Sequence, residues 1–81
     1  MLKLNILLFG ITTDLVGTSN LELNVPANST VAYFKNKLAA NYPQLSNIES
    51  YAIAVNESYA SNDQLLQEND VVAIIPPVSG G

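Results

Sequence analysis

The chain contains no cysteine and no histidine in its 81 residues. Their absence excludes thiol nucleophiles, Ser-His triads, thiolate and imidazole metal sites, and disulfide bonds. Catalysis by the chain alone would have to use carboxylate, lysine or tyrosine side chains, and none of these recurs at a spacing that indicates a paired site. We therefore expect a chain that is not an enzyme by itself and that binds no metal or cofactor of its own.

Basic residues are also scarce, since three lysines and no arginine face seven acidic residues, for a net charge of -4. Such a chain has little to attract phosphate groups, so neither nucleic acid nor an anionic membrane is an expected partner. The acidic residues are scattered along the sequence, as is typical of solvated surface charge. Electrostatic steering toward a basic partner remains the alternative interpretation.

Long apolar runs are absent as well, although 48% of the residues are hydrophobic. No stretch approaches the roughly 20 residues that a membrane-spanning helix needs. The apolar N-terminal stretch follows a single lysine and has no small-residue cleavage site, so we interpret it as a strand. The length allows one domain with one small core, and we expect a soluble, cytoplasmic protein.

Two strands are predicted in the first third of the chain. Residues 2–9 alternate with a period of two and are largely apolar on both faces toward Gly10, which indicates a central strand. Residues 21–25 alternate apolar and polar side chains up to Pro26, which indicates a half-buried strand. The short connection between them makes these two strands neighbours.

A short helical turn is expected in that connection, closed by Gly17, with three candidate capping residues: Thr12, Thr13 and Asp14. The clearest helix follows Ser29 or Thr30, either of which can cap it, and it ends before Pro43. Its apolar residues fall at spacings of three and four, namely Val31, Phe34 and Leu38. Lys35 and Lys37 are expected on or near its outer side.

The second half of the chain contains the remaining strands. Residues 51–55 predict a third strand, and Tyr59 begins a short return segment after a turn at residues 56–58. Residues 71–75 form a continuous apolar run rich in β-branched side chains, which we interpret as a strand buried on both faces.

This order of elements predicts an α+β fold of the β-grasp type, a mixed sheet of about five strands packed on one main helix. The first and last strands are the most apolar, so they are expected side by side and parallel at the centre. A ferredoxin-like fold would need a second full helix between residues 56 and 70, and that segment is too short and too polar. The predicted division is a domain at residues 1–75 and a flexible tail at residues 76–81.

The tail reads Pro76, Pro77, Val78, Ser79, Gly80 and Gly81. The prolines cannot extend a central strand and favour polyproline II geometry, so they form a stiff spacer. Six residues reach about 20 Å at roughly 3.3 Å each. The two glycines lack a Cβ and can pass through a channel too narrow for side chains, which brings the terminal carboxylate against buried groups of another protein. A frayed terminus is the alternative.

The Val-Asn pair before Tyr59, then Leu66, and the segments FGITTDLVG and ENDVVAIIPPVSGG together resemble the family of small, sulfur-carrier subunits of molybdopterin synthase. The resemblance covers nearly the whole chain in length and element order, and it is strongest at residues 55–81. It implies a ubiquitin-like β-grasp fold, in agreement with the pattern of strands and helix.

The resemblance also implies a mechanism. An adenylating, E1-like activating enzyme would use ATP and magnesium to adenylate the carboxylate of Gly81, and a sulfur donor would convert it to a thiocarboxylate. The tail would then insert into the large subunit of molybdopterin synthase, in a heterotetramer, and pass sulfur to cyclic pyranopterin monophosphate in molybdenum cofactor biosynthesis. Gly81 and Gly80 would carry this chemistry.

The remaining candidate residues would bind the partner. Phe9, Tyr59 and Ile75 are implied to form an apolar docking patch at the base of the tail, and Pro76, Pro77, Val78 and Ser79 would follow it into the large subunit. The chain departs from the family pattern at Thr13 and Asp14, where Arg-Glu is frequent, and at Ile75, where an aromatic residue occurs. Three alternatives remain open: a thiamin-pathway sulfur carrier, a ubiquitin-like protein modifier that acts through Gly81, and an interaction module without terminal chemistry.

Overall fold

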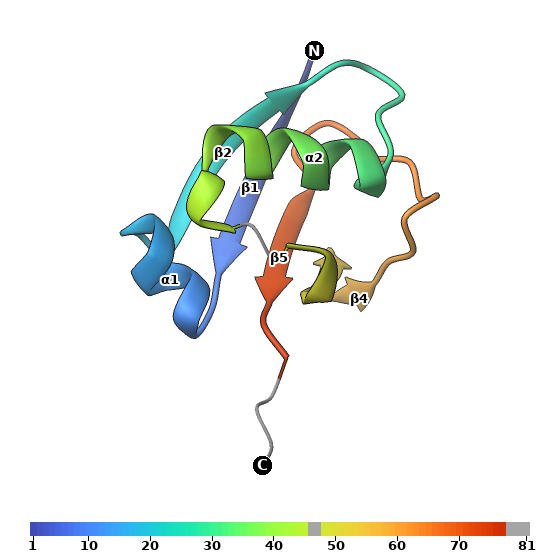
Figure 1. Cartoon of the computed structure of the whole chain (residues 1–81). Helices are drawn as coiled ribbons and strands as arrows, with labels where there is room; N and C mark the ends of the chain where they lie inside the picture. The colour runs from blue at the N-terminus through green and yellow to red at the C-terminus, as the bar shows by residue number, and fades with distance from the viewer. Residues whose placement is uncertain (46–47, 78–81) are drawn as a thin grey trace.

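The computed structural model of the chain describes residues 1–45 and 48–77, and Figure 1 shows how its elements are arranged. The described helices are α1 (Ile11–Val16), α2 (Val31–Asn41) and two short 3-10 helices, Pro43–Leu45 and Ile48–Ser50. The strands are β1 (Leu2–Leu8), β2 (Asn20–Val25), β3 (Ala52–Val55), β4 (Ser58–Tyr59) and β5 (Val71–Ile75). None of the helices in the described residues is long and apolar enough to cross a membrane.

The strands form one five-stranded sheet in the order β2-β1-β5-β3-β4. Its central strands, β1 and β5, run parallel and pair in a register that places Leu8 opposite Ile74. The other neighbouring pairs are antiparallel, and α2 crosses one face of the sheet (Figure 1). The predicted mixed sheet on one main helix, with the first and last strands parallel at the centre, is therefore confirmed.

The core lies between α2 and one face of the sheet. Every second residue of β1 is buried there, namely Leu4, Ile6 and Leu8, and α2 contributes Val31, Phe34 and Leu38, all fully buried. Burial of each such side chain stabilises the fold by about 1.5–3 kcal/mol. The period of two in the strand and the spacing of three and four in the helix thus bring the two apolar faces together.

Helix α2 begins where the sequence predicts, because the hydroxyl oxygen of Thr30 accepts a hydrogen bond of 3.2 Å from the N–H of Tyr33. The cap predicted for α1 is wrong. Gly10 is its N-cap and no side chain caps it, so all three candidates, Thr12, Thr13 and Asp14, lie within the helix. The hydroxyls of Thr12 and Thr13 instead bond back to Phe9 and Leu8 respectively, at and just after the end of β1. Gly17 closes α1 in the left-handed conformation, as predicted.

The outer position predicted for Lys35 is also wrong, since this side chain is only 5% exposed. The segment that precedes β5 covers this side of α2, and Asn62 accepts a hydrogen bond from the N–H of Ala32 through its backbone carbonyl. The side-chain oxygen of Asn62 accepts another from Lys35 Nζ at 3.0 Å. A polar loop thus buries a charged side chain by supplying a partner for it. Lys37 is half-buried.

The third error concerns β5, which was predicted to be buried on both faces. Only Val72 and Ile74 are fully buried, while Val71, Ala73 and Ile75 face the other side and keep part of their surface in solvent. The reason is that α2 covers a single face, and no described element covers the other. Strand β1 also ends at Leu8, one residue earlier than predicted.

A two-residue turn joins β3 to β4, with Val55 paired to Ser58. Its residues Asn56 and Glu57 both have positive φ, 51° and 72°, as a type I′ turn requires. The amide of Asn56 donates to a carboxylate oxygen of Asp70 at 2.9 Å and its carbonyl oxygen accepts from the N–H of Val71 at 3.0 Å. These hydrogen bonds fix the turn to the start of β5.

We predict that Asp70→Ala lowers the free energy of unfolding by about 2–3 kcal/mol, because it also removes the acceptor of the Gln67 N–H, at 2.8 Å. Urea unfolding measures this change. Asn56→Gly, which tolerates positive φ, breaks the same side-chain contact, so the double variant should lose less than the sum of the two single losses. Asp63→Ala, at an exposed carboxylate, is the control. Additive losses would contradict the proposed coupling.

Candidate functional site

The face of the sheet that points away from α2 is here called the open face. Along β1 the side chains on this face change from polar to apolar. The open-face residues of β1 are Lys3 and Asn5, then Leu7, with Phe9 just beyond the strand. The neighbouring strand β5 presents three apolar side chains on the same face: Val71, Ala73 and Ile75. The open face is therefore polar at the start of β1 and apolar toward its end and along β5. It is also polar on β2, where Asn20, Glu22 and Asn24 are exposed.

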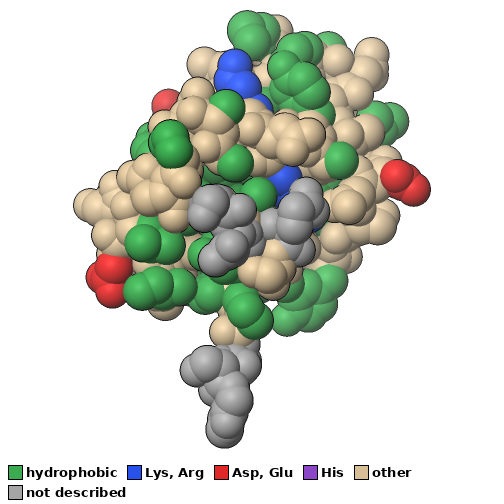
Figure 2. All heavy atoms as spheres, viewed as in Figure 1, with side chains coloured by type: hydrophobic (Ala, Val, Ile, Leu, Met, Phe, Trp, Pro, Cys, Tyr) green, Lys and Arg blue, Asp and Glu red, His purple; other side chains and the backbone are tan. Residues whose placement is uncertain are grey.

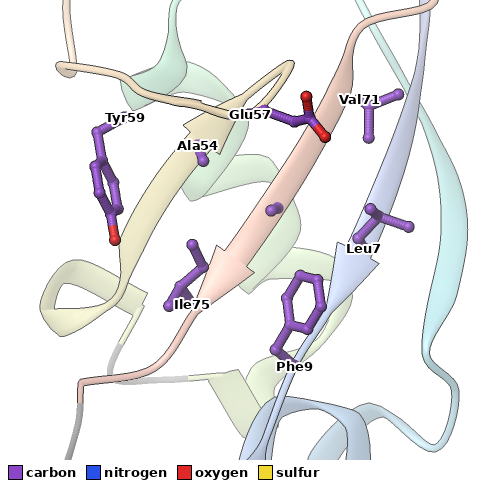
Figure 3. A pocket seen from close by; sticks show the side chains of 8 residues that line it. Leu7, Phe9, Ala54, Glu57, Tyr59, Val71 and Ile75 are labelled. Carbon is purple, nitrogen blue, oxygen red and sulfur yellow. The ribbon is translucent and has the colours of Figure 1, made fainter.

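Seven apolar side chains form this part of the open face, which we call the open-face patch. They are Leu7, Phe9, Ala54, Tyr59, Val71, Ala73 and Ile75, and together with Glu57 they line a hollow of about 330 Å³. Figure 3 shows them on the side of the sheet opposite α2, contributed by β1 and the loop that follows it and by β3, β4 and β5. Phe9 and Tyr59 are both exposed to solvent, at 48% and 77% of their residue surface.

The structure thus brings together the three docking residues that the sequence analysis named, Phe9, Tyr59 and Ile75. The structure adds Leu7, Val71 and Ala73 to this group. These three could have been predicted from the sequence, because residues two positions apart in a strand lie on the same face, and they precede Phe9 or Ile75 by two or four positions. Ala54 pairs with both Ala73 and Tyr59 across the sheet. The position of Glu57 beside the patch could not be predicted from the alternation of apolar residues, because Glu57 lies in the β3–β4 turn and not in a strand.

The tail leaves the body beside this patch. Pro76 and Pro77 follow β5 directly and have no regular secondary structure. The predicted site residues Val78, Ser79, Gly80 and Gly81 lie outside the described residues, so the domain division at residue 75 and the roles of these four stay predictions. Hydrophobic side chains gather around the point at which the chain leaves the body (Figure 2).

The backbone at the base of the tail is tightly arranged. A Cβ on Gly10 would lie 3.1 Å from Cγ of Pro76, and Gly10 has a φ of 57° and a ψ of -134°. Few residues other than glycine adopt this conformation. Glycine therefore allows the loop after β1 to approach the first proline of the tail closely.

Two threonines hold the same loop. The hydroxyl of Thr12 accepts a hydrogen bond of 3.0 Å from the N–H of Phe9 and donates one to the carbonyl of Phe9. The hydroxyl of Thr13 donates to the carbonyl of Leu8 at 2.9 Å. Phe9 is thus exposed on a backbone that these hydrogen bonds fix, and the hydroxyl of Thr13 has its partner within the chain.

The chemistry of this surface is that of binding. Exposed apolar patches with polar surroundings are typical of protein–protein interfaces. The residues that line the hollow include one carboxylate and no group that is paired with it for proton transfer. Within the described residues, no three or more His, Cys, Asp or Glu side chains cluster in a way that could hold a metal ion.

Comparison with known proteins identifies the family. Residues 6–81 match the ThiS family. The chain is 35% identical to the molybdopterin synthase sulfur carrier subunit of Arabidopsis thaliana, over 98% of this chain and 83% of that protein. It is 37% identical to the protein of the same name from Dictyostelium discoideum, over 98% of this chain and 96% of that protein.

Solved structures have the same fold. Small archaeal modifier protein 1 of Methanosarcina acetivorans has a TM-score of 0.84 at 25% identity, covering 100% of this chain and 98% of that one. The complex of subunits 1 and 2 of the molybdopterin-converting factor of Helicobacter pylori gives 0.71 at 20% identity, covering 99% and 100%. The ubiquitin of Caldiarchaeum subterraneum gives 0.66 at 20% identity, covering 99% and 98%.

The ubiquitin-like β-grasp fold predicted from the sequence is therefore confirmed, and so is the resemblance on which the functional expectations depend. The family match and the two relatives cover almost the whole chain. The chain belongs to the ThiS family, and its relatives there are sulfur carrier subunits of molybdopterin synthase.

Proposed function

We propose that this chain is the sulfur carrier subunit of a molybdopterin synthase. The observation that carries the proposal is the likeness to sulfur carrier subunits at 35% and 37% identity over 98% of the chain. The chain is then the sulfur donor of a two-subunit sulfurtransferase, and it is not an enzyme by itself. Such a role requires a free carboxylate at Gly81, which follows Gly80.

The proposed chemistry takes place at the carboxylate of Gly81. This carboxylate attacks the α-phosphorus of ATP, held with magnesium by an E1-like activating enzyme, and pyrophosphate leaves. A sulfur nucleophile then attacks the carbonyl carbon of the acyl-adenylate and AMP leaves, because the anhydride has a far better leaving group than a free carboxylate. The resulting thiocarboxylate passes its sulfur to cyclic pyranopterin monophosphate, and two such cycles complete the dithiolene.

The folded body would act as the docking element for the tail. Strand β5 contributes Val71, Ala73 and Ile75 to the open-face patch and continues directly into Pro76. A partner that covers the patch therefore holds the start of the tail as well. Binding of the body then makes insertion of the tail an intramolecular step, with an effective concentration of about 1 mM or more for a short connection.

The proposed partner for this surface is the large subunit of the synthase. One structural neighbour is seen in a complex of subunits 1 and 2 of the molybdopterin-converting factor. The activating enzyme and a sulfur donor are further partners in the proposal, whereas nucleic acid and membranes are not. The final assembly would be a heterotetramer in the cytoplasm, where ATP for the activation step is available.

A second candidate function is that of a protein modifier. It is favoured by the likeness to small archaeal modifier protein 1, at 25% identity and a TM-score of 0.84. In that case the activated carboxyl of Gly81 would form an isopeptide bond with a lysine of a target protein instead of accepting sulfur. Both functions use the same adenylate, so they differ only in the nucleophile that attacks it.

The first prediction concerns loading of the tail. Incubation with the activating enzyme, ATP, magnesium and a sulfur source should raise the intact mass by one sulfur-for-oxygen exchange, because AMP is displaced by sulfur. A matched chain with one extra residue after Gly81 is the control and should stay unloaded. An unchanged mass under conditions that load another carrier would contradict the proposal, and lysine-linked conjugates on denaturing gels would favour the modifier.

The second prediction concerns the open-face patch. Tyr59→Ser should weaken binding to the large subunit about tenfold or more by calorimetry, because exposed aromatic residues in interfaces contribute much of the affinity. Its melting temperature should change little, since Tyr59 is 77% exposed.

The matched control is Tyr33→Ser, which removes a 44% exposed tyrosine from α2, away from the patch. This variant should bind the large subunit as the unmodified chain does. Equal losses of affinity in the two variants, or no loss in Tyr59→Ser, would show that the open-face patch is not part of the interface.

A further inference from the structure

Glu57 is the charged side chain among the eight residues that line the hollow of the open-face patch. It also lines a second hollow of about 280 Å³, together with Leu7, Asn56 and Val71. In Figure 3 its carboxylate extends from the β3–β4 turn over β5, toward Val71. A negative charge therefore lies between two depressions of an otherwise apolar surface.

This carboxylate has no partner within the described part of the chain. No hydrogen bond or ion pair joins it to another described residue, and the ion pair found there, between Lys3 and Glu22, lies elsewhere on the open face. A protein that covers the open-face patch will remove water from Glu57. Removing water from an unpaired carboxylate opposes binding unless the partner supplies a compensating charge or hydrogen-bond donors.

The backbone of Glu57 points to a role beyond the fold. Its φ of 72° lies in the left-handed region, at the second position of a turn in which glycine is the favoured residue. A longer side chain at this position carries a conformational cost, and such strain in a native structure is a reason to look for a function. The preceding residue, Asn56, is bonded through its side chain to both Asp70 and Val71, and these bonds favour the observed turn.

We propose that Glu57 is the anchor for a cationic side chain, arginine or lysine, of the synthase large subunit. The aliphatic stem of such a side chain would lie on the apolar floor of the hollow, which includes Ala54, Ala73 and Ile75. Its charged end would pair with the Glu57 carboxylate. The exposed rings of Phe9 and Tyr59 line the same hollow, and aromatic faces attract cations as well.

This inference rests on the proposed function, because it names the chemistry of the partner at the surface proposed for docking. It also gives that surface a means of selection. A purely apolar patch accepts many apolar partners, whereas a fixed carboxylate disfavours any partner that places an acidic or uncharged group opposite it. The net charge of -4 makes a basic partner surface complementary to the rest of the chain as well.

The experiment measures binding of the purified large subunit to variants of the full chain by calorimetry. Glu57→Gln should raise the dissociation constant about tenfold and Glu57→Lys about a hundredfold. Reversing a charge at an interface weakens binding more than removing it, because reversal adds repulsion to the lost attraction. The affinity of the unmodified chain should fall with added salt, and that of Glu57→Gln should fall less steeply.

Glu22→Gln is the control, because it removes one negative charge from the same open face, on the edge strand β2 and outside the open-face patch. It should bind within about twofold of the unmodified chain, since surface charges away from an interface have small effects. If Glu57→Gln binds as Glu22→Gln does, the inference is wrong.

Glu57→Gly separates this role from a structural one. Glycine relieves the strain at a φ of 72°, so the melting temperature should rise by about 4 °C while the affinity falls about tenfold. A more stable variant with undiminished affinity would overturn the inference. Failure of the unmodified chain to load sulfur or to bind the large subunit would instead contradict the proposed function, which keeps the two conclusions distinguishable.

Discussion

The parallel pairing of β1 with β5 is the constraint on which the rest of the structure depends. Because the two strands run in the same direction, their ends meet at one edge of the sheet, with Leu8 opposite Ile74. The loop that carries Phe9 and the start of the tail at Pro76 are therefore neighbours. An antiparallel pairing would separate them by the length of the sheet, and the patch and the tail could not act together.

A single main helix can cover only one face of five strands, and the consequence is the open face. Near β2 this face is polar and needs no cover. Around β5 it is apolar, with Phe9 and Tyr59 largely in solvent. Burial of apolar surface is favourable by about 25 cal/mol per Å², and in the free chain these side chains remain exposed. A partner that covers them therefore gains this free energy on binding. Glu57 then restricts which partner can do so.

Much of the fold could be predicted, because period and capping are local properties of a sequence. The predictions were correct for the range of β5, for the start of α2 after a cap at Ser29 or Thr30, and for the central parallel pair. The burial of Lys35 and the exposure of one face of β5 could not be predicted from local patterns. Both depend on whether a segment far away in the sequence packs over that surface. The same holds for Glu57, which reaches the patch only through the β3–β4 turn.

The central claim is that the open-face patch, and not the helical side, receives the partner. Methyl and amide NMR signals of the labelled chain, followed during addition of the large subunit, test it most directly. The account predicts the largest changes at Leu7, Val71 and Ile75, with little change at Ala32 and Asn36 of α2. Large changes at α2, with Val71 and Ile75 unaffected, would contradict it.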